Sequence, residues 1–173
     1  MMKKIENFHD YCKLARETAI YPEKLGSAYA ALGLIEELGE ILDVWSIPEG
    51  HNNRKKEAGD VLWYMSELCH VLMLDIDAVF NYNNTKYFDY SRFFGNIQKE
   101  ICKFAGVIKK IERDGITLEK KEKVADFLRN CFILIWHRMN SDNIDMLTVA
   151  QNNIEKLQSR KERGTLQGDG NDR

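Results

Sequence analysis

The sequence has little of several features that mark common protein classes. Only two of its 173 residues are proline, which favours helices because proline breaks a helix interior. Four cysteines are scattered without a CxxC pair, which favours buried free thiols in a reducing cytosol over disulfides or a zinc site. A formal net charge of −2 lacks the basic surplus of a general nucleic-acid binder. No apolar run approaches a membrane span and the polar N-terminus has no signal-peptide core, so we expect a cytoplasmic protein without a membrane partner.

What the sequence has in abundance is helix-forming residues, since Leu, Ile, Glu and Lys are frequent. We predict an all-α fold, an antiparallel helix bundle, with one domain over residues 1–160 and a flexible tail with basic and glycine residues over 161–173. The predicted helices span approximately 5–19, 23–45, 52–74, 75–82, 90–113, 117–139 and 141–160.

Two acidic repeats lie in predicted helices, Glu36-Glu37-Leu38-Gly39-Glu40 and Glu57-Ala58-Gly59-Asp60. In each repeat, acids three or four residues apart share one helix face. The loop between them is short, so the two helices are expected to run antiparallel and to face each other. Carboxylates that converge in this way repel one another unless a cation neutralises them. Oxygen ligands without His or Cys indicate a hard cation, Mg²⁺ or alternatively Mn²⁺.

The predicted metal ligands are Glu37, Glu40, Glu57 and Asp60. A solvated acidic helix face is the plain alternative, but glycine inside a helix costs about 1 kcal/mol relative to alanine, so Gly39 and Gly59 call for a reason. Close approach of two helices, or room for a metal with its waters, would supply one. Glu36 is an additional acid. It acts either as the general base for an attacking water or as a hydrogen-bond partner behind the ligands.

The order ExxE, loop, ExxD resembles the all-α nucleoside triphosphate pyrophosphohydrolases, the MazG-like group related to dimeric dUTPases. Residues 18–22 resemble the entry to the family's first acidic helix, and residues 59–64 resemble its second acidic helix. Residues 153–157 with the arginines that follow resemble its C-terminal segment. The resemblance implies a helix bundle of that type, a homo-oligomer with a dimer favoured, and Mg²⁺. It also implies that Glu36 and Glu37 are catalytic in the hydrolysis of a (d)NTP to its monophosphate and pyrophosphate.

The resemblance further implies triphosphate contacts in the last helix, where Asn153, Lys156 and Arg160 form one stripe. Lysine and arginine neutralise phosphate oxygens, but a surface helix with internally paired charges has the same pattern. Lys56 belongs to a basic cluster of residues 54–56, which either holds the β and γ phosphates or is simply a solvated helix start. The tail arginines Arg163 and Arg173 either close over the substrate or belong to a disordered segment.

Four aromatic residues are candidates for stacking on a base, although aromatic residues at helical spacing usually belong to a core. They are Tyr29, Trp45, Trp63 and Tyr64.

About 65 residues separate the acidic helices from the C-terminal segment, more than in simple relatives. Residues 95–100 have a residue pattern similar to that of 33–37, and residues 123–128 have one similar to that of 57–62. We hypothesise an internally duplicated helical hairpin, with residues 1–84 as the active copy and 85–145 as a degenerate one. The alternative is that any two amphipathic helices look alike.

Two other functions compete with hydrolysis. A carboxylate di-iron bundle uses two ExxH motifs and two further glutamates. The chain offers Glu6 with His9 and Glu67 with His70, to which Glu37 and Glu100 would be added. A catalytically decayed helical partner protein is the other alternative, in which the acids would bind no metal.

Overall fold

The computed structural model describes residues 4–45, 51–81 and 88–167, and over these ranges the chain is helical and contains no strand. This confirms the all-α prediction. The helices are α1 (Phe8–Arg16), the 3₁₀ turn η1 (Glu23–Leu25), α2 (Gly26–Trp45), α3 (His51–Leu72), α4 (Ile76–Val79), α5 (Tyr90–Gly95), α6 (Ile97–Asp114), α7 (Leu118–Ser141) and α8 (Met146–Glu162). No helix among the described residues is both long and apolar enough to cross a membrane.

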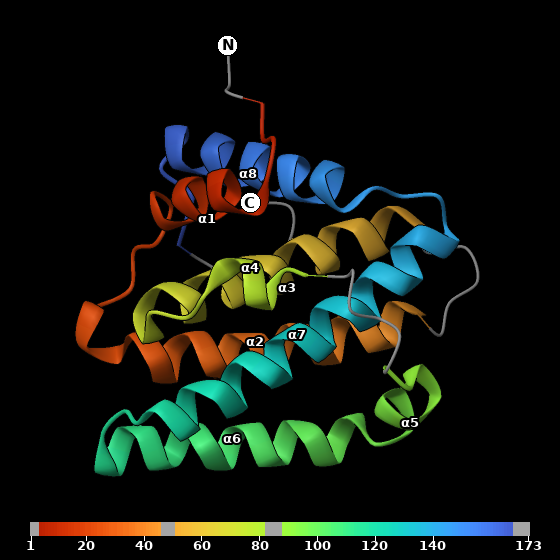
Figure 1. The fold of residues 1–173 in the computed structure, drawn as a ribbon. Coiled ribbons are helices and arrows are strands. Elements are labelled where there is room, and N and C mark those ends of the chain that lie inside the picture. Colours follow the sequence, from red (N-terminus) through yellow and green to blue (C-terminus); the bar gives the residue numbers. More distant parts are fainter. Residues whose placement is uncertain (1–3, 46–50, 82–87, 168–173) are drawn as a thin grey trace.

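The antiparallel pair α2 and α3 occupies the centre of the bundle (Figure 1). Helices α1 and α8 lie against each other and against α3, and α6 and α7 lie on the other side of the pair. The interior is filled by aliphatic side chains such as Leu34, Leu38, Leu62 and Met65, which are fully or almost fully buried. The acidic repeats therefore sit on two neighbouring antiparallel helices, as predicted.

Helix ends follow local hydrogen bonding more closely than the predicted ranges do. The predicted cap Thr117 is confirmed, since its hydroxyl accepts from the Lys120 amide at 3.3 Å. The single helix predicted over 90–113 is interrupted at Asn96, whose side chain donates to the Arg92 carbonyl and competes with the helical ladder. The predicted start at residue 141 is wrong, because α8 begins at Met146 behind the N-cap Asp145.

Helices α3 and α7 end in the same way. Met73 and Asn143 adopt positive φ angles of 51° and 56°. The next amides, of Leu74 and Ile144, each donate 2.9 Å bonds to carbonyls five residues back. An aspartate then caps the following helix in both places. Residues 74–75 and 144–145 are therefore locally equivalent in backbone structure, and the internal duplication stays a hypothesis.

The cysteines follow the prediction with one exception. Cys12, Cys69 and Cys131 are buried free thiols, and burial raises the pKa of Cys12 to about 11. Cys102 is exposed on α6, because α6 buries only the stripe that carries Phe104 and its helical neighbours.

Candidate functional site

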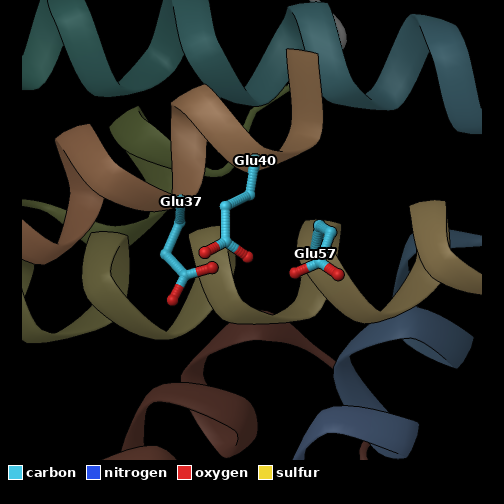
Figure 2. A group of neighbouring side chains, drawn as sticks. All are labelled: Glu37, Glu40 and Glu57. Carbon is cyan, nitrogen blue, oxygen red and sulfur yellow. The ribbon is translucent and has the colours of Figure 1, made fainter. Parts of the chain in front are cut away.

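Three of the four predicted metal ligands come together between α2 and α3. Each of Glu37, Glu40 and Glu57 offers a carboxylate oxygen, and these three oxygens all lie within 4.8 Å of one another. Figure 2 shows the carboxylates of Glu37 and Glu40 extending from α2 toward α3, beside that of Glu57. The i,i+3 spacing on α2 and the antiparallel packing of α3 produce this cluster, which we name the acidic triad.

The acidic triad is electrostatically unfavourable without a cation. Glu57 is 5% exposed, and its Oε2 atom has no hydrogen-bond partner among the described residues. A buried carboxylate oxygen without a donor is costly, and a cation would satisfy it. Burial, followed by repulsion from Asp60 and Glu40, raises the pKa of Glu37 to about 8 and that of Glu57 to about 6. All-oxygen donors and an orphaned buried oxygen fit a hard divalent cation.

The fourth predicted ligand, Asp60, is held by α8. Lys156 Nζ lies 2.6 Å from Oδ1 and 2.5 Å from Oδ2 of this carboxylate. Asn153 Nδ2 donates to Oδ1 at 3.0 Å, and the Tyr11 hydroxyl donates to the Asn153 side-chain oxygen at 3.0 Å. Asn153 is 4% exposed, so its position favours orienting Asp60 over contacting a phosphate. No sequence pattern pointed to Tyr11, which looks like an ordinary core residue.

The two glycines of the acidic repeats have different surroundings. A Cβ atom on Gly59 would lie 2.9 Å from Asn153 Cβ, so this glycine permits the close approach of α3 and α8. That is one of the two reasons that the sequence suggested. A Cβ on Gly39 would meet nothing within 4 Å, so close packing does not explain this glycine.

A cavity of about 890 Å³ opens beside the acidic triad. Its lining includes the acidic side chains Glu36, Glu37, Glu40, Glu57 and Asp60, together with Arg160. The other lining residues are Thr18, Ile20, Tyr21, Tyr29, Leu32, Gly33, Trp63, Tyr64, Leu157, Leu166 and Gln167. Acids and aromatic rings therefore line the same cavity.

The aromatic wall consists of Tyr21, Tyr29, Trp63 and Tyr64. Tyr21 and Tyr29 stack with their centroids 4.6 Å apart, and the Trp63 and Tyr64 rings meet edge to face at 4.9 Å. A Cβ on Gly33 would lie 2.2 Å from the Tyr64 ring, so glycine makes room for this wall. Of the four aromatic candidates, Tyr29, Trp63 and Tyr64 line the cavity, whereas Trp45 is not among the lining residues.

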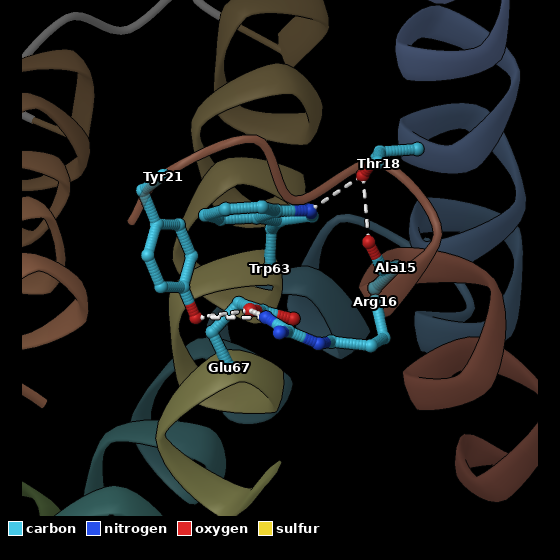
Figure 3. A network of polar contacts seen from close by, with 6 residues as sticks. All are labelled: Ala15, Arg16, Thr18, Tyr21, Trp63 and Glu67. Atoms are coloured by element: carbon cyan, nitrogen blue, oxygen red, sulfur yellow. Dashed lines mark hydrogen bonds and ion pairs between the residues drawn. The ribbon is translucent and has the colours of Figure 1, made fainter. Parts of the chain in front are cut away.

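A polar network holds Tyr21 and Trp63 of this wall in place (Figure 3). The fully buried Glu67 accepts hydrogen bonds from Arg16, at 2.7 Å, and from the Tyr21 hydroxyl. The Trp63 indole donates to the Thr18 hydroxyl at 2.9 Å. The role of Tyr21 was not predicted, because its partner Glu67 is 46 residues away in the sequence.

Other predicted groups lie elsewhere. Arg54, proposed for phosphate binding, is 2% exposed and pairs with Asp142 at 3.0 Å, so that proposal is wrong. Lys56 is exposed and is not among the residues lining the cavity. Arg163 is exposed, and Arg173 lies outside the described residues.

The di-iron groups are not brought together. Glu67 pairs with Arg16, the exposed His9 pairs with Asp77 at 2.9 Å, and Glu100 pairs with Lys103. Within the described ranges, the acidic triad is the only group of three metal-binding side chains this close together.

The segment predicted as a flexible tail begins as helix. Residues 161 and 162 continue α8, and Gly164, with φ of 71°, turns the chain. The Thr165 amide then donates to the Arg160 carbonyl at 2.8 Å, which closes a helix-terminating motif. This turn carries Leu166 and Gln167 to the cavity, and the flexibility of the segment stays a prediction.

No protein-family model and no solved structure matches the chain. The "Gene 37 protein" of Mycobacterium phage L5 is 36% identical over 77 residues, which are 43% of this chain and 68% of that protein. Its name states no activity. This similarity shows that the chain belongs to the family of the Gene 37 protein of Mycobacterium phage L5.

Proposed function

We propose that the protein is a Mg²⁺-dependent nucleoside triphosphate pyrophosphohydrolase. One observation carries the proposal: the acidic triad and several aromatic rings line a single cavity. A nucleotide has the complementary arrangement, with a metal-binding triphosphate at one end and a planar base at the other. The resemblance of the acidic repeats to the MazG-like group supports the same reaction.

Glu37, Glu40 and Glu57 are the residues that would hold Mg²⁺, or Mn²⁺ in its place. Their oxygen-only donor set and the unsatisfied buried Oε2 of Glu57 support this assignment. When bound, the metal supplies charge neutralisation for the triphosphate and polarises its phosphoryl oxygens.

The reaction breaks the bond between the α-phosphorus and the bridging oxygen to the β-phosphate, as the oxygen of a water attacks the α-phosphorus. Glu36 lines the cavity and is exposed to solvent, so its carboxylate can accept the proton of that water; the alternative role of a hydrogen-bond partner stays open. Arg160 is buried at the cavity wall and would stabilise the departing pyrophosphate. Tyr21, Tyr29 and Trp63 offer ring surfaces to the base.

The test is pyrophosphate release from a panel of dNTPs and NTPs, with and without Mg²⁺, with the products identified as mono- or diphosphates. We expect monophosphate and pyrophosphate from at least one nucleotide, and only with metal. Glu37→Gln should lower turnover at least 100-fold, whereas Glu122→Gln, an exposed change on α7 with the same charge difference, should not alter it. Full activity in Glu37→Gln, or no turnover of any nucleotide by folded protein with Mg²⁺, would refute the proposal. A homodimer is part of the proposal, and light scattering measures it.

A further inference from the structure

The carboxylate of Asp60 is paired with a cation of the protein itself, the ammonium group of Lys156. Lys156 Nζ contacts both of its oxygens, and the two side chains are only 20% and 17% exposed. Limited solvent makes this attraction stronger than that of a surface ion pair. The contact links α8 to α3 directly beside the acidic triad.

The oxygens of Asp60 have little capacity left for another partner. A carboxylate offers about four lone-pair sites. Lys156 uses one on each oxygen, and Asn153 uses another on Oδ1. A metal that took Asp60 as a ligand would find one remaining site, on Oδ2, which Lys156 also contacts, so the metal and the ammonium would repel each other there. The same carboxylate is close enough to the acidic triad to raise the pKa of Glu37 and Glu57 by its charge.

We propose that Lys156 is an internal cation that competes with the divalent metal for Asp60. The metal then binds to the acidic triad alone while Lys156 stays in place, and Asp60 becomes a ligand only when Lys156 leaves. The competition lowers metal affinity in the absence of a triphosphate. This inference rests on the metal site of the proposed function.

The test is calorimetric titration of the full chain with Mn²⁺ in the absence of nucleotide. Lys156→Gln should bind Mn²⁺ at least about fivefold more tightly than the original chain, because four carboxylates become available. Lys156→Arg keeps the cation and should stay near the original affinity. Lys161→Gln, the same charge change on the exposed part of α8, is the matched control and should have no effect.

A double variant separates competition for Asp60 from a general effect of charge. Lys156→Gln with Asp60→Asn has three carboxylates and no lysine, so its affinity should return to that of the original chain. An equally tight double variant, or an unchanged affinity in Lys156→Gln, would overturn the inference. If the original chain hydrolyses a nucleotide but Lys156→Gln leaves the Mn²⁺ affinity unchanged, this inference alone is refuted. If the Mn²⁺ affinities are as expected but no nucleotide is hydrolysed, only the proposed function is refuted.

Discussion

Lowering the pH from 8 to 6 should weaken Mg²⁺ binding and stabilise the protein in EDTA. The pKa of Glu37 is raised to about 8 and that of Glu57 to about 6, chiefly by burial and then by the neighbouring carboxylates. Both values exceed the ordinary value of 4.5. Between pH 4.5 and pH 8, the folded protein therefore holds protons that the unfolded chain has lost. The free energy of unfolding in EDTA falls as the pH rises through this range.

The size of the effect on metal affinity follows from the same pKa values. Mg²⁺ binds ionised carboxylates, so binding below pH 8 releases a proton from Glu37. Each released proton makes the affinity change about tenfold per pH unit, and Glu57 adds to this slope near pH 6. From pH 6 to pH 8 the affinity should therefore rise roughly 50- to 100-fold. Each proton retained on folding contributes at most about 1.4 kcal/mol per pH unit to the free energy of unfolding in EDTA.

The assay is Mg²⁺ calorimetry at pH 6, 7 and 8 in two buffers of different ionisation enthalpy, which counts the protons released. Thermal melts in EDTA and in Mg²⁺ at each pH report stability, and the metal should raise the melting temperature most at pH 8. Glu37→Gln should remove most of the pH slope, and Glu122→Gln should keep it. An affinity that does not change between pH 6 and 8 would refute the electrostatic reasoning about the acidic triad.

Four substitutions test the surroundings of the site by thermal or denaturant unfolding. Glu57→Gln removes a buried charge and should raise stability in EDTA while abolishing the stabilisation by Mg²⁺; a retained Mg²⁺ effect would contradict its role as a ligand. Gly59→Ala should lower the free energy of unfolding by about 1–3 kcal/mol, because the new Cβ would meet Asn153. Gly39→Ala places its Cβ in open space and should raise the free energy of unfolding by about 1 kcal/mol. Equal effects of the two substitutions would refute the packing argument. Tyr11→Phe should cost about 1–3 kcal/mol because it leaves the buried Asn153 oxygen without its donor, and an unchanged midpoint would refute this.

The acidic triad was predictable because it depends on local rules. Spacing along α2 and a short connection to an antiparallel α3 suffice to bring Glu37, Glu40 and Glu57 together. The partner of Asp60 was not predictable from such rules, since Lys156 is 96 residues away in the sequence. Some helix ends were predicted wrongly for a similar reason. Asn96 and Asn143 end helices through hydrogen bonds and backbone angles, which hydrophobic periodicity does not report.

Long-range pairing also explains the wrong assignment of Arg54. A basic residue beside an acidic repeat suggests a phosphate contact, but burial against Asp142 of the loop after α7 uses its charge within the fold. The aromatic wall is the opposite case. Trp63 and Tyr64 looked equally suited to a core, and only the glycine at position 33 and the stacked Tyr21 and Tyr29 rings give them a surface on the cavity.

The cavity draws its described lining from two parts of the chain, residues 18–64 and 157–167. These are largely the segments that carry the resemblance to the pyrophosphohydrolases. None of the described lining residues comes from 65–156, although α6 packs on α2 and α7 packs on α3. Helices α6 and α7 thus support the central pair from the side away from α8 (Figure 1). They reach the site only through α2 and α3, so changes in their solvent-exposed positions should leave metal affinity unaltered, whereas loss of their buried contacts would loosen the pair that holds the acidic triad.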